Sequence, residues 1–239
     1  MIEPITRSVI KPISGGTHLM VNSTTSMLPK LCSLNTALPV NVEWNNKSVY
    51  TGFIKRPSTE SLPISSQGIE GDGQGDLKNH GGPDKAACVY SQDHYGWWTD
   101  EMKRPFEAGA FGENFTVTGL TEDIVCIGDV YRIGTAVVQV SQPRQPCFKL
   151  AAHLERKEMV MRVRETGYSG FYFRVLENGV VQAGDTFEML RREGSGSTIA
   201  ECNRILYDER GDTPALRQLL AEPALAESLR KHLSKRLAD

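Results

Sequence analysis

The sequence predicts a mainly β fold, a closed or partly closed barrel with flanking helices, followed by a small domain of three helices. Short runs rich in β-branched residues recur between residues 28 and 190, and Gly, Pro and Asp separate them. Two helical patterns interrupt these runs. A polar Gly/Ser stretch then separates them from a helical C-terminal region, which indicates a domain boundary.

The strand pattern carries the barrel prediction. The clearest runs are residues 49–54 and 136–140, and turn dipeptides such as Gly128-Asp129 and Asn178-Gly179 separate the others. Many short strands in succession favour a sheet that curls into a barrel. Further strands are predicted at residues 86–90, 114–118, 130–133, 170–175 and 186–190.

Two helices are predicted within the barrel region. Residues 92–102 carry an aromatic cluster, and residues 153–165 place Leu154, Met159 and Val163 on a shared face. Such helices would plug or flank the barrel.

The chain divides into four predicted parts. The first 27 residues show no sustained period, which indicates a poorly ordered leader, a vector-derived extension or an upstream start site, and Met27 is a possible natural start. The rest divides into a barrel domain (28–190), a linker (191–197) and a three-helix domain (198–239) with helices at 199–206, 215–220 and 225–237.

Composition excludes several partners. The net charge is −2, so there is no excess of Lys and Arg to neutralise nucleic acid or an anionic membrane. No apolar run approaches the length of a membrane span, and no secretory signal is evident. The five cysteines stand apart with no CxxC pair, which is typical of reduced thiols in the cytosol. We therefore expect a cytoplasmic protein.

The densest cluster of chemically capable residues is SQPRQPC, residues 141–147, directly after a predicted strand. Its two prolines stiffen the backbone, so Arg144 and Cys147 are presented close together. A nearby guanidinium favours the thiolate, the form of Cys that ligates metals or attacks electrophiles. The alternative is a turn with a buried structural Cys, the commoner role of an isolated cysteine.

Two further clusters contain glycines beside polar side chains. His80 precedes Gly81 and Gly82, which allow close approach of a ligand, although a plain tight turn explains them equally well. Gly112 stands near Asn114, whose amide suits a heterocycle edge or, alternatively, a strand-entry turn. The GDGQG stretch, residues 71–75, lacks dinucleotide-loop spacing and is interpreted as a flexible loop.

Taken in chain order, these clusters resemble the MOSC family, named after the C-terminal domain of molybdenum-cofactor sulfurase, and within it the YiiM-type bacterial branch. The tail resembles the three-helix domain of that branch through CNRILYD (202–208), LRQLL (216–220) and KRL (235–237). The first 27 residues have no counterpart. The barrel motifs are VYTGFIKRP (49–57), IEGD (69–72), HGGPDKA (80–86), GAFGENF (109–115), SQPRQPCFK (141–149) and SGFYFR (169–174).

The resemblance implies a β-barrel in which Cys147 binds the molybdenum of a molybdenum cofactor (molybdopterin). Thiolate is a soft ligand suited to such a centre. Pyridoxal phosphate is not expected. The residues implied for the pterin and its phosphate are Lys55, His80, Gly81, Gly112, Asn114, Gln142 and Arg144.

The implied reaction is reduction of N-hydroxylated compounds, such as hydroxylamino-purines, to amines, an oxidoreductase activity that detoxifies N-hydroxylated bases. Glu113 and His80 are candidate proton donors, each with an equally good structural reading. No flavin, nicotinamide or iron–sulfur module is evident, so an external electron-donating reductase is expected. The three-helix tail is a candidate docking element for it, or serves packing or homodimer formation.

Two other functions remain open. Cys147 as a persulfide would make the protein a sulfur carrier or transferase. A non-catalytic carrier of the molybdenum cofactor would bind molybdopterin without turnover. Both depend on Cys147, as the reductase does.

Overall fold

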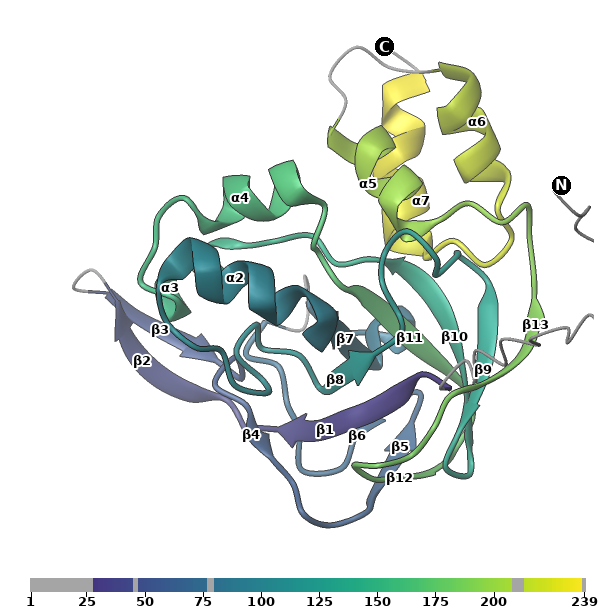
Figure 1. Ribbon diagram of the computed structural model, residues 1–239. Helices are drawn as coiled ribbons and strands as arrows, with labels where there is room; N and C mark the ends of the chain where they lie inside the picture. Colours follow the sequence, from purple (N-terminus) through teal and green to yellow (C-terminus); the bar gives the residue numbers. More distant parts are fainter. Residues whose placement is uncertain (1–27, 45–46, 77–79, 208–212, 238–239) are drawn as a thin grey trace, which may run out of the picture.

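The structure is a computed structural model that describes residues 28–44, 47–76, 80–207 and 213–237 (Figure 1). The predicted leader, residues 1–27, lies outside the described residues. A curled sheet forms the centre, helices cover one end of it, and a group of C-terminal helices stands beside them (Figure 1). In the described part of the chain, no helix has the length and apolar character to cross a membrane.

The main sheet has eight strands. In spatial order they are β13 (Glu188–Arg192), β9 (Asp129–Ile133), β10 (Ala136–Pro143), β11 (Phe171–Glu177), β7 (Ala87–Ser91), β8 (Phe115–Thr118), β1 (Lys30–Thr36) and β4 (Arg56–Pro57). Six of the eight strands lie at predicted runs, whereas β1 and β4 were not predicted. The predicted run 49–54 lies outside this sheet, where Lys47–Thr51 forms β3 of a separate hairpin. The central strands β7 and β10 are buried along their whole length, as expected for segments that line a core, whereas the edge strands β13 and β4 are mostly exposed.

The sheet curls until its far sides meet. Neighbouring strands pair antiparallel except β7 and β8, which are parallel. The start of β1 also bonds the segment that leads into β13: Leu31 N–H donates to Asp185 O over 2.8 Å, and Phe187 N–H donates to Pro29 O over 2.8 Å. The sheet is thus a half-barrel closed at one end, which confirms the predicted fold class.

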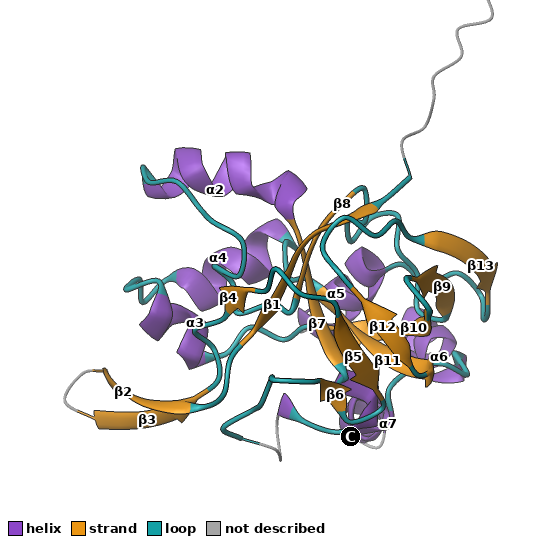
Figure 2. Cartoon of the chain, turned by 90° about the horizontal axis from the view of Figure 1, so that it is seen from below, coloured by secondary structure: helices purple, strands orange, loops and turns teal. Residues whose placement is uncertain are grey.

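Two smaller sheets flank the half-barrel. One contains β12 (Gly179–Val181), β5 (Leu62–Ser65) and β6 (Gly68–Ile69). The other is the hairpin of β2 (Val40–Trp44) and β3 (Lys47–Thr51), which projects from the body beside α3 (Phe148–His153) (Figure 2).

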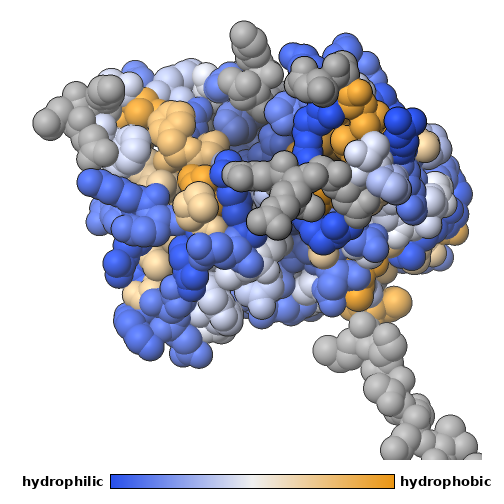
Figure 3. Space-filling model, turned by 90° about the horizontal axis from the view of Figure 1, so that it is seen from above, coloured by the Kyte–Doolittle hydropathy of each residue, from blue (hydrophilic) through white to orange (hydrophobic). Residues whose placement is uncertain are grey.

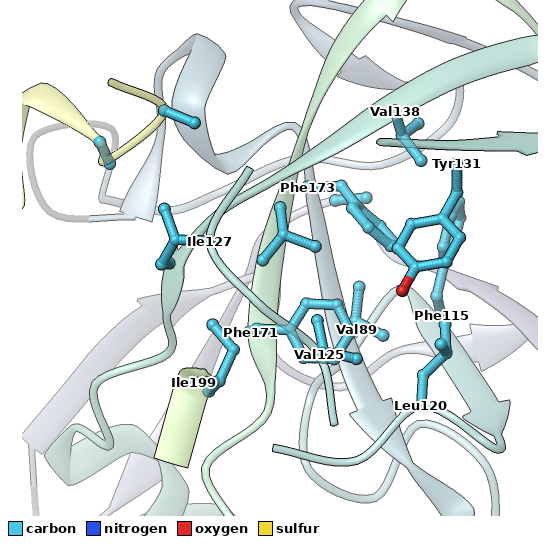
Figure 4. Packing of buried hydrophobic residues seen from close by; sticks show 14 of the residues in the cluster. Val89, Phe115, Leu120, Val125, Ile127, Tyr131, Val138, Phe171, Phe173 and Ile199 are labelled. Atoms are coloured by element: carbon cyan, nitrogen blue, oxygen red, sulfur yellow. The ribbon is translucent and has the colours of Figure 1, made fainter. Parts of the chain in front are cut away.

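The core of the half-barrel is built from side chains of successive strands. Phe115, Tyr131, Phe171 and Phe173 point toward one another between the strands (Figure 4). Phe171 and Phe173 meet edge to face with ring centroids 5.3 Å apart, the arrangement that aromatic quadrupoles favour. Ile199 of the C-terminal region extends the same cluster (Figure 4).

A second core lies under the helices at the other end. α2 (Tyr95–Met102) follows the short 3₁₀ turn η2 (Gln92–His94), as the aromatic cluster predicts. Trp98 is fully buried and donates from Nε1 to the hydroxyl of Tyr90 over 2.6 Å. Tyr90 in turn stacks on Phe111 with centroids 4.0 Å apart.

The helix predicted at residues 153–165 is wrong in its bounds. The structure has α3 (Phe148–His153) and a separate α4 (Met159–Thr166) instead. Glu155 adopts a left-handed backbone with φ of 55°, which an α-helix cannot contain. Leu154, Met159 and Val163 are nevertheless buried together against α2, so the apolar pattern was correct although the helix is broken.

The C-terminal region forms three helices, as predicted. They are α5 (Ile199–Tyr207), α6 (Thr213–Ala221) and α7 (Glu227–Ser234), followed by the 3₁₀ turn η3 (Lys235–Leu237). Leu216, Leu229 and Leu233 belong to the same continuous cluster of buried residues as the half-barrel strands.

The segment between strand and helices is anchored. β13 extends to Arg192, which the sequence assigned to the linker. Glu222 then accepts hydrogen bonds from the backbone of Ser195 over 3.0 Å and from the Ser197 hydroxyl over 2.7 Å. The Gly/Ser stretch is therefore held by the carboxylate of Glu222, the residue that follows the C-terminal end of α6.

The surface is mainly polar. Seen from above, most of it is hydrophilic, with apolar residues gathered in smaller areas at the left and right of the view (Figure 3). Large exposed apolar side chains come from several elements, among them Leu38, Tyr50, Phe148, Met161 and Met189.

Candidate functional site

Two adjoining cavities open beside the end of β10. The inner pocket has a volume of about 70 Å³. Two loop segments, residues 51–55 and 73–75, form one side of it, and residues from the strands form the other. The outer cleft, of about 410 Å³, lies between the strands and α7. Both cavities are lined by His80, Lys85, Gln145, Cys147 and Tyr172.

Cys147 lies where the two cavities meet. It is a free, half-buried cysteine with an extended backbone, directly before α3. β10 ends at Pro143, and the next residues turn the chain across the mouth of the half-barrel. Arg144 and Cys147, which the sequence predicts to lie close together, both line the inner pocket.

Arg144 places a buried positive charge in the inner pocket. The residue is only 6% exposed, and its guanidinium lies over the ring of Phe53 at 5.6 Å. Among the residues that the structure describes, no carboxylate pairs with this guanidinium and no acceptor is within hydrogen-bond reach of it. Burial lowers the pKa of Arg144, but the acidic groups around it, Glu113 among them, outweigh burial and raise the pKa above its ordinary value, so the charge is retained.

Other basic side chains surround the same space. Lys149 lines the inner pocket, and Lys85 lines both cavities and lies 5.9 Å from the centre of the Tyr172 ring. Burial lowers the pKa of Lys85 below its ordinary value. Burial, together with the charge of Lys149, lowers the pKa of His80 to about 4, so this imidazole is neutral at pH 7.

Lys55 and Asn114 line the inner pocket, but both are engaged by the protein. Lys55 forms a buried ion pair with Asp72. The Asn114 amide donates to Asp72 Oδ2 over 2.9 Å and to Asn35 O over 3.2 Å, and accepts from the Cys88 backbone over 3.1 Å. These two residues therefore build the pocket wall, and the charge of Lys55 is balanced by Asp72.

Gly112 permits the packing beneath Arg144. Its φ is +74°, and a Cβ at this position would lie 2.8 Å from the ring of Phe53. Only glycine lets Phe53 occupy the place from which it supports the guanidinium. Gly81 adjoins His80 but lines neither cavity.

Gln142 faces the outer cleft instead of the inner pocket. Its Nε2 donates to Pro143 O over 3.2 Å, and its Oε1 accepts from the Ser228 hydroxyl over 3.4 Å. Gln142 thus connects the end of β10 to α7.

Glu113 lies outside both cavities. It is fully buried, and its carboxylate accepts from the Tyr95 hydroxyl over 2.6 Å, the Thr116 hydroxyl over 2.7 Å and the Phe111 backbone over 3.0 Å. Its two oxygens are committed to holding the loop before β8, so the structure favours the structural reading of Glu113.

Sequence reasoning missed several lining residues. The GDGQG stretch, interpreted as a flexible loop, packs against β3: a Cβ on Gly75 would lie 2.4 Å from Tyr50 O, and Gly73 and Gly75 line the inner pocket. Cys88 and Tyr172 also line it from buried strands, where nothing in the pattern separates them from ordinary core residues. Burial raises the pKa of Cys88, which keeps its thiol protonated.

The neutral state of His80 predicts a pH dependence of stability. Its folded-state pKa of about 4 lies below the ordinary 6.5, so between these values the unfolded chain binds a proton that the folded protein does not. The contribution of His80 to stability is present above pH 6.5 and is lost as the pH falls through 4. From about pH 7 to pH 5, wild type should lose about 1 kcal/mol more unfolding free energy than His80→Gln, after discounting for partial exposure.

Urea denaturation at the two pH values measures this difference. Burial also lowers the pKa of His153, but His153 lines neither cavity. The His153→Gln variant is therefore the matched control, because it removes a buried histidine that lies outside the site. Equal losses in wild type and His80→Gln would contradict the assignment.

Within the described ranges, no three His, Cys, Asp or Glu side chains are grouped to hold a metal ion. Cys147 offers a thiolate donor, and the buried Arg144 guanidinium that lines the same pocket suits an anionic ligand.

Comparison with known proteins identifies the family. A MOSC domain model matches residues 76–188, and a YiiM-like 3-alpha helix domain model matches residues 198–239. The chain is 50% identical over 204 residues to the uncharacterized protein YflK of Bacillus subtilis, covering 85% of this chain and 92% of that protein. The chain belongs to the YiiM-like MOSC family.

Within this family the fold is closely shared. The crystal structure of YiiM from Geobacillus stearothermophilus matches with a TM-score of 0.76 and 40% identity, over 87% of this chain and 99% of that one. A protein named Reductase from Gibberella moniliformis is 35% identical over 146 residues, 59% of this chain but only 26% of that protein. The YiiM-like MOSC chain thus matches about a quarter of a much longer reductase.

Proposed function

We propose that this protein binds a molybdenum cofactor through Cys147 and reduces N-hydroxylated compounds, hydroxylamino-purines among them, to amines. The observation that carries the proposal is the buried Arg144 guanidinium, which faces the same pocket as the free Cys147 and has no carboxylate partner among the described residues. A buried cation without a counter-ion is costly unless a ligand supplies one.

The residues present fit molybdopterin. Arg144 and Lys149 face the inner pocket and suit the negative charge of its phosphate. Cys147 offers a thiolate to the metal. His80, neutral at pH 7, offers one N–H donor and one acceptor to a heterocycle edge.

A bound cofactor would supply two electrons for cleavage of an N–OH bond, which with two protons gives an amine and water. The protein's own residues would bind and orient the reactants. Cys147 lines both cavities and would hold the metal, Arg144 and Lys149 would bind the cofactor from the inner pocket, and the outer cleft would be left for the substrate. Tyr172, which is buried and lines both cavities, provides apolar surface beside Cys147.

An external reductase is part of the proposal. The electrons must come from a donor, and the relative named Reductase is about four times as long as the segment it shares with this chain. Its name and length are compatible with a domain of this kind working beside an electron-supplying module, which here would be a separate protein.

The test is metal content followed by turnover. Protein from a host that makes the cofactor should contain near-stoichiometric molybdenum and pterin, and should reduce N-hydroxyadenine to adenine with a chemical electron donor. Metal-free protein with a cyanide-labile sulfur on Cys147 would instead support sulfur transfer. Bound cofactor without turnover on any N-hydroxylated compound would support a carrier.

A further inference from the structure

Helix α7 is fixed to the half-barrel at the edge of the outer cleft. The Asp84 carboxylate accepts from the backbone of Glu227, the first residue of α7, over 3.0 Å and pairs with Arg174 at 2.8 Å. Arg174 also donates to Ala224 O over 2.9 Å. The Ala226 N–H donates to Ser141 O over 3.0 Å, one residue before Gln142. These contacts set the position of α7 relative to the end of β10.

One face of α7 forms a wall of the outer cleft. Ser228 and His232 are four residues apart, so they lie one above the other on the helix, and Leu229 stands beside them. All three line the cleft, which Cys147 also lines. Leu229 is buried, whereas Ser228 and His232 are exposed to the cleft and solvent.

The chemistry of this cleft differs from that of the inner pocket. The inner pocket gathers cations, which suit an anion. The outer cleft has one cation, Lys85, and one carboxylate, Asp76, in its lining. It also combines the rings of Phe148 and Tyr172 with neutral hydrogen-bonding side chains, which are Gln142, Gln145 and Ser228. Aromatic surface beside amides, a hydroxyl and charges of both signs suits a planar heterocycle that stacks on its face and hydrogen-bonds along its edge.

We propose that α7 is the specificity wall of the enzyme, and that His232 and Ser228 hydrogen-bond the ring edge of a planar N-hydroxylated heterocycle held in the outer cleft. The inference rests on the proposed function and assigns the two residues that select cyclic substrates over acyclic ones. Small N-hydroxylated compounds without a ring lack the edge that His232 and Ser228 contact. These two residues position the substrate and take no part in the redox step.

The first test compares two substrates in protein of measured molybdenum content. The specificity ratio, kcat/KM for N-hydroxyadenine divided by kcat/KM for hydroxylamine, should fall about tenfold in His232→Ala and further in His232→Ala/Ser228→Ala, the loss expected for one and then two hydrogen bonds. Lys231→Ala, on the same helix but outside the cleft, is the matched control and should leave the ratio unchanged. An unchanged ratio in both His232 variants overturns the inference.

The second test needs no turnover. In cofactor-free protein, adenine should shift the imidazole NMR signals of His232, and Lys231→Ala should retain that shift. A shift without any N–OH reduction would refute the proposed function while supporting the cleft as a heterocycle site. Turnover with no shift and no change in the specificity ratio would refute the α7 inference alone.

Discussion

Replacing Cys147 by alanine is expected to reduce molybdenum content to background and N-hydroxyadenine reduction by at least about a thousandfold, because the substitution removes the thiolate proposed to hold the metal. The thiol is half-buried and has no hydrogen-bond partner in the described part of the chain, so the fold should persist. Elemental analysis, steady-state kinetics and thermal denaturation measure the three quantities on one preparation.

The matched control for this variant is Cys32→Ala. Cys32 is also a free, half-buried cysteine, but it lies on β1 beside Thr118, away from both cavities. Its variant should keep full molybdenum and activity. Normal metal content in Cys147→Ala would remove the shared basis of the reductase, sulfur-transfer and carrier readings.

The second large effect is expected when Arg144 is replaced by methionine. The substitution should weaken cofactor binding but should not weaken the fold. Arg144→Met should lower cofactor occupancy about a hundredfold, because a charged hydrogen-bonding group to an anion contributes several kcal/mol. The cofactor-free variant should be as stable as wild type or more so, since the substitution removes a buried charge without a carboxylate partner among the described residues. Pterin content and the thermal midpoint of the cofactor-free proteins test both parts.

Arg162→Met provides the comparison. Arg162 also lies over an aromatic ring, 5.5 Å from Trp97, but on the surface, where it pairs with Glu101 at 2.7 Å and Glu165 at 2.6 Å. Its replacement should leave pterin content unchanged and stability within about 0.5 kcal/mol. A strongly destabilised Arg144→Met protein with normal pterin content would mean that Arg144 is structural.

Much of the fold follows from local patterns. The strands at 136–140 and 130–133 were predicted within a few residues, because β-branched runs bounded by turn residues have few alternative structures. The break between α3 and α4 was missed, since the apolar spacing continues through residues 153–165 while Glu155 turns left-handed. Periodicity reports which side chains are buried together, and it does not report whether the backbone between them is continuous.

The sequence predicted many of the residues that line the site, but not which of their polar groups are free to bind a ligand. His80, Asn114 and Cys147, which come from three separate motifs, all line the inner pocket. Which of their polar groups are free for a ligand depends on distant partners: Asn114 is occupied by Asp72 and Asn35, whereas Arg144 is not paired with any described carboxylate. The contribution of α7 has no signal in the sequence, because it arises only when the last helix packs against the first half of the chain.

The contact between α7 and Asp84 joins the C-terminal helices to a turn in the first half of the chain. Asp84 follows His80 by four residues and precedes Lys85, and the same carboxylate holds the first turn of the last helix. Since the leucines of α6 and α7 also share the buried cluster of the strands, the half-barrel and helices are one cooperative unit despite the Gly/Ser stretch between them. The apparent boundary near residue 195 is therefore not a free hinge, because movement there would break the Glu222 contacts of the Gly/Ser stretch and the Asp84 contact of α7.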